Sequence, residues 1–421
     1  MRAILQRVDA AAQTVATTST PAPLRVLIVH NAYQQRGGED AVVDAERDLL
    51  RAHGHPVEIF QRHNDELRDE RGDGLRGIAL AQAAVDTIWS RQSVVTLQSI
   101  IARFKPDVVH FHNTFPLISP AAYRAVRAAG LPVVQTLHNF RLHCPQAMYL
   151  RDGKVCENCL GKLPWRSVLH ACYRDSRVQS AVLSGMLVVH RTLGTYRDHV
   201  TRYIALNSFC RDKFIQGGLP PERVVIKPNF VDFAAPPLRA RGGFLFVGRL
   251  SAEKGIRVLM DAWRLADAGL NGAILRVAGT GAEAFRFDDV VRLHALGALD
   301  GAAVREQMAC ASVLVLPSIC YDSFPRTLVE AFASGLPVIA SRLGPLADLV
   351  QEGVTGLLFA PGDAADLANK LRWACAHPAE LAEMGLRARA KYEAEFCAER
   401  NYPQLMAIYA DAIQAITTEQ R

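Results

Sequence analysis

Two carboxylates, those of Asp322 and Glu330, stand eight positions apart in the stretch PSICYDSFPRTLVEAFASG. Proline is favoured at the start of a helix and glycine just after its end, so Pro325 and Gly335 predict a helix through LVEAFA. Glu330 then lies in its second turn, and Asp322 lies in the loop before it. Such a pair could act as a general acid and base, or it could grip a ligand by accepting hydrogen bonds from neighbouring hydroxyls, as a ribose presents them. A solvated glutamate and a helix-capping aspartate are the structural alternative.

A second loop carries two cations. Arg249 and Lys254 lie in VGRLSAEKG, between an apolar strand-like run and a helix. The N-terminus of a helix is partially positive, and this opposes a purely structural role for cations there. Arginine grips two oxygens with its planar fork, whereas lysine supplies a mobile point charge. The pair therefore predicts a binding site for an anion such as a diphosphate.

Glycines follow strand-like runs in two further loops. Gly37 and Gly38, in NAYQQRGGEDA, precede a helix whose free N–H groups could receive an anion. This loop lacks the G-x-G-x-x-G fingerprint, so an ordinary turn is the alternative. Gly279 and Gly281, in VAGTG, mark another place where the backbone could meet a flat ligand.

Histidines end two strand-like runs in the first half of the chain. His110 and His112 lie in DVVHFHN, and His138 and His143 lie in TLHNFRLHC. A lone histidine after a strand is usually a hydrogen-bonded structural residue. His138 ends a strand whose C-terminal tip should face a ligand cleft, so it is the stronger candidate for a functional role.

The order of the elements predicts the fold. Short apolar runs alternate with amphipathic helices, which is typical of parallel strands covered on both faces, and the pattern restarts in the second half. We expect two doubly wound α/β domains, at 24–200 and 201–385, and C-terminal helices at 386–421 that pack across the junction. Ligands bind beyond the carboxyl ends of strands in such sheets, so the loops above should face a cleft between the domains. Residues 1–23 are small and polar, and we expect a disordered tail there.

Charge and hydropathy argue against several classes of protein. A net charge of +6 suits an anionic ligand. The sequence has no block of lysine and arginine with interleaved aromatic residues, and this argues against a nucleic-acid module. No stretch approaches the ~20 apolar residues of a membrane span, and SAVLSGMLVVH (180–190) fits a buried or amphipathic helix better. The N-terminus lacks the apolar core of a signal peptide and the nine cysteines are odd in number, so we expect a cytoplasmic protein.

Four cysteines form a cluster within an insertion at 144–172. The Asp152-Gly153 pair between them is a two-residue hairpin signal. A C-x2-C knuckle with two outer cysteines is compatible with a closed, tetrahedral structural zinc site, with an unmetallated hydrophobic cluster and redox-labile pairing as alternatives. The candidate ligands are Cys144, Cys156, Cys159 and Cys172.

In combination, these motifs resemble the retaining glycosyltransferases of family four. The GGED loop, the HFHN and TLHN strand ends, GRLSAEKG, VAGTG and the PSxxxDSFPRTLVEA run occur in the family's order, and the likeness covers about 24–415. The resemblance implies the GT-B architecture, in which two Rossmann-like domains enclose a nucleotide-sugar cleft. It also implies catalysis that requires no metal or other cofactor.

The same resemblance implies roles for residues. Arg249 and Lys254 would hold the donor diphosphate and stabilise the leaving nucleotide. Glu330 would bind the ribose hydroxyls, while His138 and Asp322 would be the catalytic residues beside the transferred sugar. The family usually has glutamate at the position of Asp322, whose side chain is one methylene shorter. The other donor-binding residues that the resemblance implies are Gly37, Gly38, Gly279, Gly281, Phe324, Thr327 and Leu328.

We therefore expect a retaining hexosyltransferase of polysaccharide, lipopolysaccharide or exopolysaccharide biosynthesis. Its partners would be a nucleotide-sugar donor and a glycan or lipid-linked acceptor, with peripheral contact at the inner face of the membrane and no nucleic acid. The alternatives are a sugar-nucleotide-binding member without turnover and, less favoured by the charge pattern, a zinc-dependent interaction module. An α-glucan phosphorylase has the same architecture, but no residue here marks a cofactor lysine.

Overall fold

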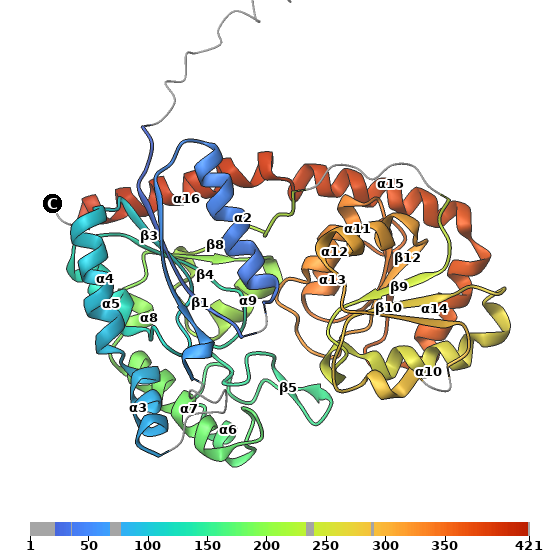
Figure 1. Cartoon of the computed structure of the whole chain (residues 1–421), viewed down its shortest axis with the longest axis horizontal. Helices are drawn as coiled ribbons and strands as arrows, with labels where there is room; N and C mark the ends of the chain where they lie inside the picture. The colour runs from blue at the N-terminus through green and yellow to red at the C-terminus, as the bar shows by residue number, and fades with distance from the viewer. Residues whose placement is uncertain (1–21, 35, 68–76, 233–239, 288–289, 420–421) are drawn as a thin grey trace, which may run out of the picture.

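The chain folds into two α/β domains that lie side by side (Figure 1). The computed structural model describes residues 22–419 except 35, 68–76, 233–239 and 288–289. The expected tail at 1–23 therefore lies, up to residue 21, outside the described residues.

The first domain is built on a six-stranded sheet. Its strands are β1 (Val26–Ala32), β2 (Val57–His63), β3 (Val108–Asn113), β4 (Val133–Thr136), β7 (Arg202–Ala205) and β8 (Val224–Ile226). They follow the order β2-β1-β3-β4-β7-β8, and every neighbouring pair is parallel. The helices are α2 (Gly38–Ala52), α3 (Gly77–Ile88), α4 (Arg91–Phe104), α5 (Ala121–Ala128), α6 (Trp165–Leu169), α7 (Arg177–Thr192), α8 (Thr195–Asp198) and α9 (Ser208–Gln216), with 3-10 turns η1 (Asn64–Leu67) and η2 (Pro221–Arg223).

The second domain repeats this design. Its strands are β9 (Phe244–Val247), β10 (Leu275–Ala278), β11 (Leu293–Gly297), β12 (Val313–Leu316), β13 (Val338–Ser341) and β14 (Gly356–Phe359). They form a parallel sheet in the order β11-β10-β9-β12-β13-β14. The helices are α10 (Ile256–Ala266), α11 (Gly301–Cys310), α12 (Arg326–Ala333), α13 (Pro345–Leu349) and α14 (Ala364–Ala376), with 3-10 turns η3 (Ala252–Lys254), η4 (Asp267–Gly269) and η5 (Ala284–Phe287).

Both sheets are apolar on their two faces, as parallel sheets require. The strands β1, β3, β12 and β13 are buried at every position. In each sheet one buried cluster packs on one face and a second cluster packs on the other. These observations confirm the predicted pair of doubly wound domains, but the predicted boundary at 200/201 is wrong. Strands β7 and β8 lie beyond it and pair in the first sheet, because a strand-helix pattern does not reveal which sheet a strand joins.

Two C-terminal helices connect the domains. Helix α15 (Pro378–Glu395) packs on α12 of the second domain, and α16 (Ala398–Glu419) returns to the first sheet. Leu405, Ile408 and Tyr409 of α16 belong to the same buried cluster as Val26 and Ile28 of β1. Figure 1 shows these helices, in red, running along both domains. The first sheet is therefore completed on one face by the end of the chain.

The insertion after β4 begins with a small hairpin. Strands β5 (Leu150–Arg151) and β6 (Lys154–Val155) are antiparallel, and Asp152 and Gly153 between them have φ values of 52° and 72°. Positive φ at both central residues is the geometry of a type I′ turn, so the hairpin predicted from this dipeptide is confirmed.

The stretch 180–190 lies inside α7, which contributes Leu183, Met186 and Leu187 to the core of the first domain. Among the described residues, no helix is both long enough and apolar enough to span a bilayer.

Candidate active site

The site lies where the strand order of each sheet reverses. In the second sheet β9 is flanked by β10 and β12, so the loops that follow β9 and β12 leave the sheet side by side. Such switch points are where open α/β sheets bind ligands. The loop after β9 carries Arg249 and Lys254, and the loop after β12 carries Asp322. The two loops predicted separately therefore meet at one switch point.

Lys254 and Asp322 form an ion pair across this switch point. Burial lowers the pKa of the Lys254 ammonium, but the adjacent Asp322 carboxylate raises it by more, so the net shift is upward. The loops pack backbone to backbone, because a Cβ on Gly255 would lie 1.7 Å from the Pro317 carbonyl oxygen. Gly255 also has a φ of 73°, which favours glycine. Both charges are thus held at fixed positions.

Arg249 is exposed and extends from the same loop, with its guanidinium 3.1 Å from the Glu253 carboxylate. The VAGTG loop supports this segment. A Cβ on Gly279 would lie 1.8 Å from the Gly248 oxygen, and one on Gly281 would lie 2.2 Å from the Leu250 oxygen. Gly279 and Gly281 therefore allow the two loops to approach closely. This packing explains glycine at both positions on structural grounds, in addition to the expected contact with a donor.

Helix α12 begins at Arg326, four residues after Asp322. Glu330 lies in its second turn, where its carboxylate accepts a 2.9 Å hydrogen bond from Arg326. Burial raises the pKa of Glu330, and Arg326 opposes this only in part. Pro325 occupies the N-cap rather than the first turn. Gly335 follows the C-cap with a φ of 61°, as predicted for the end of this helix.

The side chains of Phe324 and Leu328 are buried in an apolar cluster formed mostly by the second domain. The Phe324 ring packs on Phe396 with a centroid distance of 6.1 Å. Their expected contact with a donor would therefore have to come from their backbone. Thr327 is half-buried and stays a candidate through its side chain.

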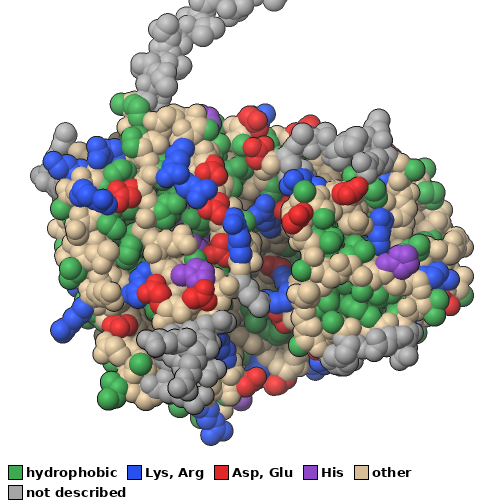
Figure 2. Space-filling model, viewed as in Figure 1, with side chains coloured by type: hydrophobic (Ala, Val, Ile, Leu, Met, Phe, Trp, Pro, Cys, Tyr) green, Lys and Arg blue, Asp and Glu red, His purple; other side chains and the backbone are tan. Residues whose placement is uncertain are grey.

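The first domain reaches this site through two loops. Gly38 starts α2, and a Cβ on it would lie 3.9 Å from that of Arg326 in the other domain. Ser323 donates a hydrogen bond to the carbonyl oxygen of His138, and its own carbonyl oxygen accepts one of 2.7 Å from Asn207. Figure 2 shows the surface hollowed where the two domains meet. The Gly-Gly loop, His138 and the Asp322 loop therefore belong to one interdomain site.

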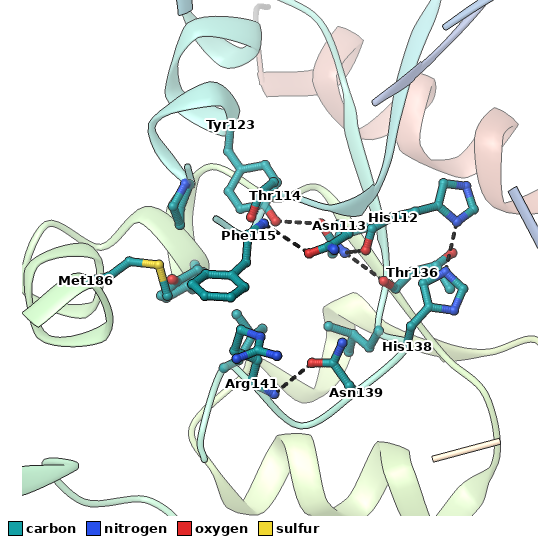
Figure 3. Close-up of a pocket in the computed structure, with 15 residues that line it drawn as sticks. His112, Asn113, Thr114, Phe115, Tyr123, Thr136, His138, Asn139, Arg141 and Met186 are labelled. Carbon is teal, nitrogen blue, oxygen red and sulfur yellow. Dashed lines mark hydrogen bonds between the residues drawn. The ribbon is translucent and has the colours of Figure 1, made fainter. Parts of the chain in front are cut away.

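His138 lies half-buried after β4, beside His112 at the end of β3. The Nε2 atom of His138 is 2.8 Å from Nδ1 of His112, and burial lowers the pKa of His138 to about 3. Both rings line a pocket of about 50 Å³ that also contains Asn139 and Arg141 (Figure 3). His138 is thus a neutral imidazole at neutral pH.

Three acidic residues near the Gly-Gly loop were missed by the sequence interpretation. Asp40 accepts a 2.8 Å hydrogen bond from the Gly37 N–H and so caps α2. Glu39 accepts one of 3.0 Å from Tyr33, while its other oxygen is buried without a partner, and burial raises its pKa to about 7. Glu46 lies two helical turns further along α2. The seven-residue spacing from Glu39 to Glu46 was a usable signal, because it places both on one face of a helix.

The four cysteines of the insertion are free thiols, and they lie close enough to one another for their charges to interact. Burial and then the other three sulfurs raise the pKa of Cys172 to about 11. Within the described ranges, no three of the sulfur atoms of Cys144, Cys156, Cys159 and Cys172 lie within 4.8 Å of one another. The zinc site stays a prediction.

Two family models match the chain along both domains. Residues 37–229 match the glycosyl transferase 4-like domain, and residues 241–377 match the glycosyl transferases group 1. The chain belongs to the group 1 glycosyltransferases. This membership confirms the family that the motifs indicated.

Curated relatives of this glycosyltransferase support the same assignment. Glycogen synthase of Mycobacterium tuberculosis is 31% identical over 306 residues, which span 70% of this chain and 66% of that protein. A GDP-mannose-dependent alpha-mannosyltransferase of Corynebacterium glutamicum is 25% identical over 350 residues, which span 80% of this chain and 77% of that protein.

Solved structures confirm the GT-B fold. HepE of Anabaena, in complex with UDP and glucose, has a TM-score of 0.62 at 19% identity, covering 92% of this chain and 99% of that one. Sucrose-phosphate synthase of Thermosynechococcus elongatus has a TM-score of 0.67 at 19% identity, covering 93% of this chain and 100% of that one.

Proposed function

We propose that this glycosyltransferase moves a hexose from a nucleotide-diphosphate sugar to a hydroxyl acceptor, with retention of the anomeric configuration. The observation that carries the proposal is the pairing of Lys254 with Asp322 at the switch point, next to Glu330 on α12. A diphosphate, a sugar and a ribose offer matching groups to a cation and two carboxylates. The relative named for its dependence on GDP-mannose supports a nucleotide-sugar donor.

The charges act on the leaving group. As the bond from the anomeric carbon to the diphosphate oxygen breaks, negative charge grows on the diphosphate, and Lys254 and Arg249 stabilise it. This requires that Asp322, when the donor binds, exchanges its ion pair with Lys254 for a hydroxyl of the sugar and so frees the ammonium for the diphosphate. The acceptor oxygen attacks from the face that the diphosphate leaves, so the configuration is retained. The acceptor hydroxyl loses its proton to the departing diphosphate oxygen, so the step needs neither a metal nor a protein base to take up that proton.

The acceptor that we propose is a glycan or lipid-linked saccharide of surface polysaccharide biosynthesis. Figure 1 places α3, α6 and α7 together at one end of the first domain. They expose large apolar side chains, with Ile78 90% exposed and Val178 73% exposed, while Arg174 and Arg177 nearby are also exposed. Apolar and basic side chains on one surface suit peripheral contact with an anionic membrane. Sedimentation with vesicles should show binding that requires phosphatidylglycerol, and a loss of that binding in Val178→Glu.

We also retain the proposal that Cys144, Cys156, Cys159 and Cys172 hold a structural zinc ion. The spacing and the mutual electrostatic range of the thiols support it. A metal would need the sulfur atoms to draw closer than they lie in this structure.

Transfer itself is tested by incubating the protein with UDP-, GDP-, ADP- and dTDP-sugars and measuring release of the nucleoside diphosphate. We expect release with at least one donor, and its loss in Lys254→Ala and Glu330→Ala. Tight binding of a donor without hydrolysis or transfer to any acceptor would instead indicate a non-catalytic member of the family. The anomeric configuration of the product, measured by NMR, tests retention.

A further inference from the structure

A row of buried side chains leads from the interior of the first domain to His138. Glu46 of α2 is fully buried, and its Oε2 atom lies 3.4 Å from Nε2 of His112. On the other side of the ring, Nδ1 of His112 lies 2.8 Å from Nε2 of His138. Among the described residues, neither Oε2 of Glu46 nor Nε2 of His112 has a further hydrogen-bond partner, although Nδ1 of His110 lies 3.7 Å from the same Oε2 atom. The row therefore connects a buried carboxylate to a residue of the interdomain site.

The carboxylate of Glu46 is held in its charged form. Lys227 is also fully buried, and its ammonium donates a 2.6 Å hydrogen bond to Oε1 of Glu46 and a 3.0 Å bond to Asn401 of α16. Burial raises the pKa of Glu46, but its surroundings, with the Lys227 ammonium the largest contributor, lower it by more, so the net shift is downward. Buried lysine and glutamate persist as ions when they are paired in this way.

A charged carboxylate determines the tautomer of the ring beside it. A carboxylate can only accept, and a neutral imidazole has one N–H and one bare nitrogen. His112, whose pKa lies well below its ordinary value because of burial, is neutral. Its N–H must be on Nε2, since otherwise two lone pairs would face each other at 3.4 Å. Nδ1 of His112 is then an acceptor, so Nε2 of His138 must donate to it.

We propose that Glu46, acting through His112, holds the proton of His138 on Nε2 and leaves Nδ1 of His138 as a hydrogen-bond acceptor for a substrate hydroxyl. Among the described residues Nδ1 of His138 has no hydrogen-bond partner and is not buried. A bare nitrogen accepts from a sugar hydroxyl but repels a phosphate oxygen. Glu46 and His112 are thus positioning residues. This inference rests on the proposed function for the identity of the hydroxyl, but not for the tautomer.

Other groups around His112 fit the same arrangement. His110 binds the Tyr409 hydroxyl through Nδ1 and the Thr136 hydroxyl through Nε2, both at 2.8 Å. His30 contacts His112 edge to face and is held by Asp40 at 2.8 Å. Ligand atoms of Glu46, His110 and His112 lie within 4.8 Å of one another, but Lys227 and Tyr409 already occupy two of these groups. The cluster is therefore a hydrogen-bond network rather than a metal site.

The test observes the ring nitrogens directly. We would label the histidines of the full-length protein with ¹⁵N and compare its spectra with those of His112→Asn and His138→Asn to assign both rings. We expect His112 and His138 to be neutral, each with its proton on Nε2, from pH 5 to pH 8. A proton on Nδ1 of either ring would overturn the proposal. Because this measurement needs no substrate, a failure of the proposed function would leave it intact.

Kinetics test the consequence for substrate. Glu46→Gln removes the negative charge that fixes the tautomers of His112 and His138. The kcat should therefore fall by about tenfold or more, while KM for the donor changes little. Glu352→Gln is the matched control, because Glu352 pairs with Arg342 and Lys370 at the surface of the second domain. Equal kcat values for wild type and a folded Glu46→Gln, or the same kcat loss in the control, would contradict the proposal. If Glu46→Gln does not fold, the ¹⁵N spectra of the wild-type histidine rings still decide whether the proposed tautomers are present.

Discussion

The ion pair between Lys254 and Asp322 makes a prediction in which two substitutions act in opposite ways. Lys254→Met should weaken binding of a nucleoside diphosphate by ~10–150-fold, because a hydrogen bond to a charged group contributes about 1.5–3 kcal/mol. Asp322→Asn should leave this affinity unchanged or raise it, because it frees the ammonium that the carboxylate occupies. It should also reduce the preference for the intact donor over the free nucleotide, since Asp322 is proposed to contact the sugar.

Stability adds a second measurement on the same pair. The side chains are 28% and 19% exposed, so breaking the pair leaves a charge that is only partly buried. We expect Lys254→Met to lower the free energy of unfolding by about 1–2 kcal/mol, below the ~3–5 kcal/mol of a fully buried pair. The double variant should recover most of this loss, since neither charge then remains unpaired.

Calorimetric titration and thermal unfolding supply both readouts. The nucleotide would be the one that raises the melting temperature of the wild type most. Lys370→Met is the matched control, because Lys370 is also a half-buried lysine paired with a carboxylate, at 3.3 Å, but lies on α14 away from the cleft. Unchanged nucleotide affinity in Lys254→Met, or an equal loss in the control, would refute the assignment of Lys254 to the diphosphate.

Three further predictions concern other parts of the molecule. Burial raises the pKa of Glu39 to about 7, so the contribution of Glu39 to stability should fall as pH rises from about 4.5 through 7. The difference in stability between wild type and Glu39→Gln, measured by denaturant titration, should change over this range; a difference that is independent of pH would contradict the burial of Glu39. Gly279→Ala would place a Cβ 1.8 Å from the Gly248 carbonyl oxygen, so it should displace the Arg249 loop and weaken nucleotide binding. Gly362→Ala is the control, because a Cβ there meets no atom within 4 Å, and it should leave nucleotide binding unchanged. Elemental analysis should find one zinc per chain, lost in Cys156→Ser; a metal-free wild type would reject the zinc site.

The fold was largely predictable because parallel α/β sheets require a sequence pattern that is easily recognised. Buried strands such as β1 and β12 are continuous apolar runs, and the helices between them are amphipathic. The Asp152-Gly153 hairpin was predictable because its turn needs positive φ at both positions. These signals are local, and local signals can be recognised without coordinates.

The site was predictable only in part, because its contacts join distant residues. The loops that carry Lys254 and Asp322 were each recognised, but their ion pair links positions 68 residues apart. Lys227 and Glu46 are 181 residues apart, and neither segment indicates a buried ion pair by itself. Phe324 belongs to a conspicuous motif, yet its side chain is buried in the core, and a motif does not reveal which way a side chain points.

The central claim is that the cleft between the domains binds a nucleotide-sugar donor through the second domain. Thermal unfolding of the wild type and of Lys254→Met with UDP-, GDP-, ADP- and dTDP-sugars tests it most directly. We predict that one class of donor raises the melting temperature of the wild type and has little effect on Lys254→Met. No shift with any donor, or equal shifts in the two proteins, would contradict the claim.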